Sequence, residues 1–303
     1  MPKNRGRDSF WVASWSLLKQ TLEEWLEDKA PQLGAALAYY TVFSLAPLIL
    51  VLLATIGVLF REDSAGAWDK ITQQISYFLD PSAMQVVQSI AQKASQPGKS
   101  TIATVIGIAL ALFGASAVFG QLQDALNTIW GVKAKPARGT WGFLRSRFLS
   151  FAMVAGICFL LLVSLAIEAL LRGFSHYVQS VLPVGIAIAL TVYLSFDFAT
   201  VVLLFAMIFK FLPDVKIQWR DVWIGAVMTA ILFGIGKWLL SLYLSSGTAG
   251  SAYGAASSLI TLLLWVYYSS QILLFGAEFT QVYAARAGRE LKPNEYAVRF
   301  AAP

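Results

Sequence analysis

The chain has 303 residues, of which 57% are hydrophobic and only 13% are charged, and its net charge is +6. Soluble domains carry roughly 25% charged residues, so this composition excludes an ordinary soluble domain and indicates a protein whose apolar surface faces lipid. The single cysteine, Cys158, excludes a disulfide framework within the chain.

Residues 1–30 are expected to form a cytoplasmic arm and a helix that lies in the membrane interface. Residues 1–8 are basic, and the segment from Ser9 to Lys29 alternates apolar and charged side chains at helical spacing. Three Trp on the apolar face favour the interface, although a helix packed on a bundle would have the same periodicity. We expect no cleaved signal peptide, because the segment has no uninterrupted apolar core. The apolar face comprises Trp11, Trp15, Leu18, Leu22, Trp25 and Leu26, and the charged face Lys19, Glu23, Glu24 and Glu27.

Six apolar runs follow, each about the ~20 residues that a helix needs to cross the hydrocarbon core. We therefore predict an all-α, polytopic membrane domain over residues 31–285 with six transmembrane helices. Pro47 removes a backbone donor within the first run and is expected to act as a hinge. The spans are predicted at Leu33–Phe60, Thr101–Gly120, Leu149–Leu171, Pro183–Phe209, Val222–Leu244 and Tyr253–Glu278.

Residues 61–100 are polar and too long for a hairpin turn. They contain two apolar stripes at helical spacing, separated by Asp80-Pro81, a pair typical of a helix start. We predict two short amphipathic helices that form a cap over one mouth of the bundle. The stripes are Trp68, Ile71, Ile75 and Phe78, and then Met84, Val87, Ile90 and Ala94.

The positions of Lys and Arg predict the orientation. With six spans and the N-terminus inside, the inner segments hold 17 of the 23 Lys and Arg, the outer loops hold 5, and Lys237 lies within a span. Inner loops of membrane proteins are enriched in these residues. Both termini, including the tail over 286–303, are therefore expected in the cytoplasm, and the cap over 61–100 on the outer side.

Four segments of the chain resemble one known family. They read LGAALAYYTVFSLAPL, LQDALNTIWGV, FLPDVKIQWRDVWIGAV and YGAASSLITLLLWVYYSSQILLFGAEF, in this order, and together they extend from about Ala30 to Tyr283. In these segments the chain is similar to the YihY/BrkB family of bacterial integral inner-membrane proteins. The resemblance implies a six-span protein of the cytoplasmic membrane. It implies no established activity, since some members carry a ribonuclease label and others a virulence or serum-resistance label.

Ionisable residues inside spans are the candidate functional groups, because a charge in hydrocarbon is expensive and is expected to face the bundle. The backbones of Asp197 and Lys237 differ in depth by roughly 9 Å, much of which a Lys side chain can span, so the two residues form either a transport site or a structural pair. Glu278, near the inner end of the last span, is expected within reach of Lys210 or Arg286, with which it would form an interfacial salt bridge. A polar stripe at the inner end of the second span either lines a vestibule or only caps the helix; it consists of Gln121, Asp124 and Asn127.

These features favour a transporter or lipid-translocating protein of the bacterial cytoplasmic membrane, and the alternative is a non-transporting envelope scaffold. We expect membrane lipids as partners, with anionic or lipid-linked species attracted by the cytoplasmic cations, and no nucleic acid. An envelope protein partner is the expectation of the scaffold alternative. The chain has no HExxH, GxSxG or P-loop motif and a single His. We therefore expect no enzymatic activity, no metal site and no cofactor.

Overall fold

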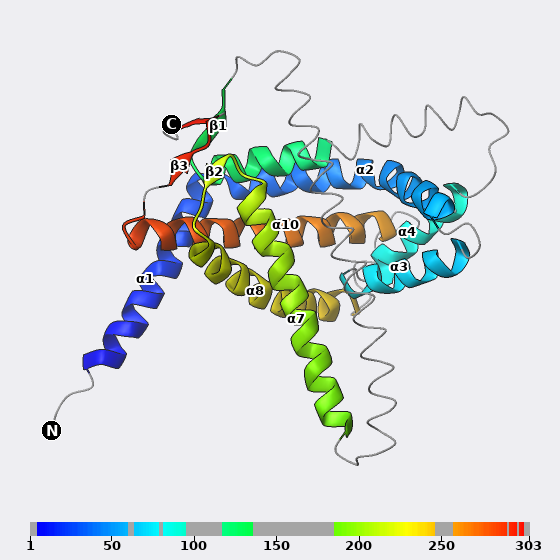
Figure 1. The fold of residues 1–303 in the computed structure, drawn as a ribbon, viewed down its shortest axis with the longest axis horizontal. Helices are drawn as coiled ribbons and strands as arrows, with labels where there is room; N and C mark the ends of the chain where they lie inside the picture. The colour runs from blue at the N-terminus through cyan, green and yellow to red at the C-terminus, as the bar shows by residue number, and fades with distance from the viewer. Residues whose placement is uncertain are drawn as a thin grey trace.

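The computed structural model describes residues 5–59, 64–78, 81–94, 117–135, 185–245, 257–289, 291–295 and 297–299 (Figure 1). These residues are mostly helical, as predicted. The predicted span at 149–171 and nearly all of the span at 101–120 lie outside the described residues, as does Cys158. Six spans are therefore neither confirmed nor contradicted.

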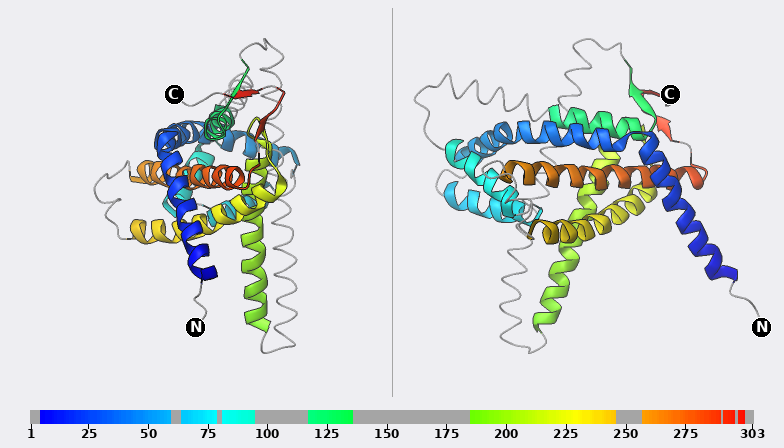
Figure 2. Two further views of the ribbon diagram at one scale, coloured as in Figure 1. Left: turned by 90° about the vertical axis from the view of Figure 1, so that its left-hand side faces the viewer. Right: turned by 180° about the vertical axis from the view of Figure 1, so that it is seen from behind.

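Four long helices form the body of the molecule: α2 (Ala30–Leu59), α7 (Gly185–Phe211), α8 (Trp219–Ser245) and α10 (Ser257–Arg286). Three described segments are long and apolar enough to cross a membrane: Leu194–Phe211, Trp219–Tyr243 and Leu259–Arg286. They correspond to the last three predicted spans. Pro47 lies inside α2 and does not end it. Helix α10 lies between α2 and α8, and α7 crosses the bundle obliquely (Figures 1 and 2).

Close approach of α8 and α10 depends on two reciprocal pairs of small residues. A Cβ placed on Gly225 of α8 would lie 1.7 Å from Thr280 Oγ1 of α10, and one on Gly276 of α10 would lie 1.9 Å from Thr229 Oγ1 of α8. Each Thr hydroxyl donates to a carbonyl on its own helix, at 2.7 Å from Thr229 to Gly225 and 2.6 Å from Thr280 to Gly276. Each helix thus offers one glycine and one threonine, and the two backbones meet as small-residue helix pairs do in membranes.

The outer face of α8 is apolar along its length and aromatic at both ends. Val227, Ile231 and Ile235 are exposed in the middle. Trp219 and Trp223 are exposed at the start, and Trp238 and Tyr243 near the end. From Trp223 to Trp238 the helix rises about 22 Å, and from Trp219 to Tyr243 about 36 Å. The exposed stripe therefore has the length of a hydrocarbon core and the aromatic ends of a lipid-facing helix.

Helix α1 (Arg5–Glu27) diverges from the bundle (Figure 2). A turn at residues 28–29 separates it from α2, and Lys29 has a φ of 54° in this turn. Trp15 is 71% exposed, and Leu22 and Leu26 are exposed as well, whereas Trp25 packs against the buried core. The apolar face of α1 is thus divided between the bundle and the outside.

Helices α3 (Ser64–Phe78) and α4 (Pro81–Ala94) lie at the opposite end of the bundle from α1 (Figure 1). They confirm the prediction of two short helices in this segment, and α4 begins at Pro81, where a fixed φ suits the first helical residue. Met84, Val87 and Ala91 of α4 are buried with Ile49 of α2. The apolar stripe of α4 therefore packs against α2 at one end of the bundle.

The all-α prediction missed four short strands. Strand β1 (Val132–Ala134) pairs antiparallel with β4 (Ala297–Arg299), and β2 (Val215–Lys216) pairs antiparallel with β3 (Lys292–Pro293). The tail predicted over 286–303 thus supplies two strands to segments that follow two different helices. These strands lie at the same end of the bundle as α1 (Figure 1).

Candidate functional site

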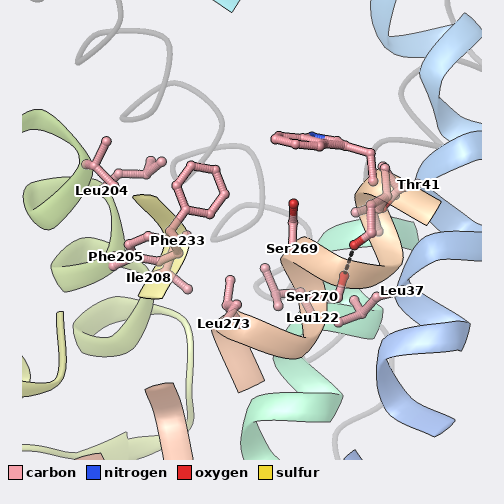
Figure 3. Close-up of a pocket in the computed structure, with 14 residues that line it drawn as sticks. Leu37, Thr41, Leu122, Leu204, Phe205, Ile208, Phe233, Ser269, Ser270 and Leu273 are labelled. Carbon is pink, nitrogen blue, oxygen red and sulfur yellow. Dashed lines mark hydrogen bonds between the residues drawn. The ribbon is translucent and has the colours of Figure 1, made fainter. Parts of the chain in front are cut away.

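A cavity of about 260 Å³ lies where the long helices meet (Figure 3). It is lined from α2, α7, α8, α10 and the helix at 117–129. The α10 residues recur at helical spacing on one face of that helix. The lining residues in the described part of the chain are uncharged, and they are Leu37, Thr41, Val118, Leu122, Val201, Leu204, Phe205, Ile208, Phe233, Trp265, Val266, Ser269, Ser270 and Leu273.

Three hydroxyl residues interrupt the apolar lining. The Ser270 hydroxyl donates to the Val266 carbonyl at 2.8 Å and is thereby satisfied within α10. The Ser269 hydroxyl points into the open space between Phe233 and Thr41 (Figure 3). The cavity therefore offers apolar surface with a hydroxyl group near its centre.

Asp197 and Lys237 lie one helical turn beyond this cavity. Asp197 is four residues before Val201 on α7, and Lys237 is four residues after Phe233 on α8, so each is displaced by about 6 Å along its helix. The segment with β2 connects the end of α7 to the start of α8. Both displacements point away from that end of the two helices. Both side chains are half-buried, and they lie close enough to interact electrostatically. The structure therefore places this predicted pair beside the cavity rather than in its lining.

The predicted polar stripe at the inner end of the second span contacts a loop instead of lining the cavity. Asn127 Nδ2 donates to Asp214 Oδ2 at 3.1 Å, and the Asp214 backbone N–H donates to Asn127 Oδ1 at 2.8 Å. Gln123 Nε2 donates to the same Asp214 oxygen at 3.2 Å. Of the other predicted members, Asp124 is exposed near Asp214 and Gln121 is half-buried. Asn127, from the predicted stripe, and Gln123, which was not predicted, thus connect the 117–129 helix to the turn after α7.

Glu278 does not form the expected ion pair with Lys210 or Arg286. Lys210 Nζ donates to the Ile217 carbonyl, and Arg286 binds Ser16 and Gln20 of α1. Glu278 is instead fully buried and faces Asp28, in the turn between α1 and α2. The cation partners predicted on α7 and α10 are thus replaced by an acidic residue in the turn between α1 and α2.

Burial raises the pKa of the Asp28 carboxyl from 3.8 to about 6. A hydrogen bond with the Glu278 carboxyl opposes this rise, and the charges of Glu24 and Glu27 add to it. Sequence reasoning did not select Asp28. The acidic run that ends α1 was the available signal, but a run of this kind is usually a solvated helix face.

No group of three His, Cys, Asp or Glu side chains within the described ranges is placed to hold a metal ion. The predicted hinge residue, Pro47, lies within α2. The candidate residues thus fall into separate places: the pair beside the cavity, the stripe at the turn after α7, and Glu278 at the junction with α1.

Comparison with known proteins gives one family. A family model described as virulence factor BrkB matches residues 21–299. A UPF0761 membrane protein of Pseudomonas aeruginosa (strain LESB58) is 28% identical over 253 residues, which are 82% of this chain and 58% of that protein. A UPF0761 membrane protein of Xanthomonas campestris pv. campestris (strain B100) is 28% identical over 292 residues, which are 93% and 64% of the two chains. No solved structure matches the chain.

The chain thus spans about three fifths of the length of the curated relatives it matches. The family match also extends beyond Ala30–Tyr283, the range that carries the resemblance. It includes Asp28 at one end and strands β3 and β4 at the other, so the junction with α1 and the paired tail belong to the matched region.

Proposed function

The chain belongs to the virulence factor BrkB family, and we propose that it is a transporter or lipid-translocating protein of the bacterial cytoplasmic membrane. Curated relatives are named membrane proteins, and three described helices are long and apolar enough to cross a membrane. The observation that carries the proposal is the cavity between these helices. A scaffold built only for packing has no need of such a space in its core.

The chemistry of the cavity supports a lipid chain as its ligand. The described lining residues are apolar apart from three hydroxyl residues, and such a surface solvates an ion poorly. Its volume of about 260 Å³ is below the roughly 300–1,000 Å³ of sites that enclose a whole drug-sized ligand. We infer that one segment of an acyl chain occupies it while the headgroup stays outside.

Asp197 and Lys237 are the proposed contact for that headgroup. They lie one turn beyond the cavity on α7 and α8, and they present both signs of charge to a group at the cavity mouth. A phosphate ester would approach Lys237, and an amine would approach Asp197. This arrangement supports a phospholipid or a lipid-linked molecule over a free fatty chain.

The proposed topology has six spans and both termini in the cytoplasm. The bundle end with β1 to β4 carries exposed cations, including Lys133, Lys216, Arg220 and Lys292. Cationic loops are retained on the cytoplasmic side, and they would attract anionic headgroups there. The exposed Trp15, Leu22 and Leu26 support an α1 that lies in the cytoplasmic interface.

We propose that this function is not enzymatic and needs no cofactor. Among its described lining residues there is no nucleophile paired with a general base and no pair of carboxylates, which are what hydrolytic sites require. Any movement of lipid would then be passive or coupled to an ion.

The proposal is tested by lipid flux in proteoliposomes. Ser269→Phe fills the cavity with a ring, and Ser241→Phe makes the same change on the exposed face of α8. The wild type and Ser241→Phe are expected to move a fluorescent phospholipid between leaflets faster than protein-free liposomes do. Ser269→Phe is expected to lose this activity while still eluting as a folded protein in size-exclusion chromatography.

Flux equal to that of protein-free liposomes in the wild type would contradict translocation and favour the envelope scaffold. Equal flux in the two Phe variants would show that the cavity is not on the lipid path.

A further inference from the structure

Helix α1 is fastened to α10 at two places. Near the end of α10, Arg286 Nε donates to Gln20 Oε1 at 2.7 Å, and its Nη1 donates to Ser16 Oγ at 2.8 Å. About two turns earlier on α10, Glu278 meets Asp28 in the turn that follows α1. The contact at Arg286 consists of ordinary hydrogen bonds, whereas the contact at Glu278 brings two acidic groups together.

The position of Glu278 is unusual for a carboxylate. The residue is 0% exposed, and it ranks among the largest fully buried side chains. No hydrogen bond of ordinary geometry reaches either of its carboxylate oxygens from the described residues. A carboxylate that is buried, ionised and without donors is strongly unfavourable, so the side chain requires a proton or a partner.

The charged groups around the pair do not neutralise it. Helix α1 contributes Glu24 and Glu27, which are acidic, and the Glu24 carboxylate accepts from Gln20 Nε2 at 2.7 Å. Helix α2 has no Lys, Arg, Asp or Glu. The nearest cation on α10, Arg286, is engaged with α1, and Lys29 is exposed. Two carboxyl groups in such surroundings cannot both ionise.

We propose that Asp28 and Glu278 form a proton-binding site, in which the two carboxyl groups hold one proton between them and join α1 to α10. The pKa of Asp28, about 6, then marks the loss of a first proton from the pair, and the fully buried Glu278 carboxyl keeps the second, which it donates to the Asp28 carboxylate. Loss of that second proton would set two like charges face to face in a buried site and weaken the contact between the helices. This site goes beyond the proposed lipid transport, since it stands whatever occupies the cavity.

Infrared titration of the full-length protein in nanodiscs tests the site. The C=O band of protonated carboxyl groups is followed as the pH is raised from 4.5 to 8. The wild type is expected to lose one protonated carboxyl near pH 6, well above exposed Asp and Glu, which titrate near 4. Asp28→Asn is expected to lose this transition, and Glu23→Gln, which removes a charge from the exposed face of α1, is expected to keep it.

A wild type whose carboxyl groups all titrate near pH 4 would overturn the proposal, as would a transition near pH 6 that persists in Asp28→Asn. If Asp28→Asn does not fold, Glu278→Leu gives the second test. Its side chain cannot donate to the Asp28 carboxylate, so the midpoint is expected to move to higher pH. An unchanged midpoint would show that Asp28 shares no hydrogen bond with residue 278. Neither readout depends on lipid flux.

Discussion

Arg289, just beyond the end of α10, places a guanidinium nitrogen 2.6 Å from the carboxylate of Asp221, in the first turn of α8. The Asp221 side chain is 1% exposed and the Arg289 side chain is 18% exposed. Negative charge at a helix start is favourable, and the guanidinium also lies over the ring of Tyr283 at 5.6 Å. The pair therefore closes the α8–α10 interface at the end where the strands lie.

Arg289→Met should destabilise the protein by about 3 kcal/mol, because removing one member of a buried ion pair leaves the other charge uncompensated. Lys216→Met, at an exposed position on β2, is the matched control and should be nearly neutral. Chemical unfolding in detergent micelles measures both. Equal loss of stability in the two variants would mean that the Asp221 pair contributes no more than an exposed cation.

Gly225→Ala should separate α8 from α10, since the added Cβ would lie 1.7 Å from Thr280 Oγ1. Overpacking of this kind costs about 1–3 kcal/mol. Gly234→Ala on the same helix meets nothing within 4 Å and should be neutral or slightly stabilising. Thermal unfolding of the two variants gives the comparison, and a melting temperature unchanged in Gly225→Ala would argue against the close helix contact.

Asn127→Asp should loosen the turn after α7. The substitution removes the amide that donates to Asp214 and places a second carboxylate against the first. The expected result is a loss of about 2 kcal/mol at pH 7.5, larger than the loss in Asn127→Ala, which removes the amide without adding a charge. Thermal unfolding of the two variants measures it. An equal loss in both would show that repulsion from Asp214 is not its cause.

Asp28 should make stability fall as the pH rises from about 4 to about 6. Its pKa is near 6 in the folded protein and 3.8 ordinarily, so between these values the folded state binds more protons than the unfolded state. The contribution of Asp28 to the free energy of unfolding is fully present below about pH 4 and is lost above about pH 6. Asp28→Asn should flatten the profile of melting temperature against pH over this window, while Glu23→Gln should follow the wild type. A wild-type profile that rises through the window would contradict the assignment.

The helices could be predicted because each is encoded locally. Long apolar runs predicted the helices α7, α8 and α10, and the apolar stripe around Met84 predicted α4, since its members lie within four turns of one another. Strand β1 could not be found in this way. It has three residues, and its register pairs Val132 with Arg299 through contacts that no local pattern encodes.

The candidate site could be predicted only in part. Asp197 and Lys237 were paired from their depths in two adjacent spans, and their side chains do interact in the structure. Glu278 was matched with cations expected at the inner ends of the spans, whereas Asp28, its neighbour in the structure, lies about 250 residues away in the chain. The cavity combines side chains from five helices, which are far apart in the sequence. Their faces meet through close contacts between helices, such as Gly34 of α2 against Gln271 of α10, and no local sequence pattern encodes these contacts.

The most direct test of the account is photo-crosslinking with a phospholipid that carries a diazirine on one acyl chain, followed by mapping of the labelled peptides. The account predicts adducts on the cavity faces of α7 and α10, among Val201–Ile208 and Trp265–Leu273, and their loss in Ser269→Phe but not in Ser241→Phe. Adducts confined to the exposed face of α8, such as at Trp223 and Ile231, would contradict it. The lipid would then only surround the protein, and the cavity would not be a lipid site.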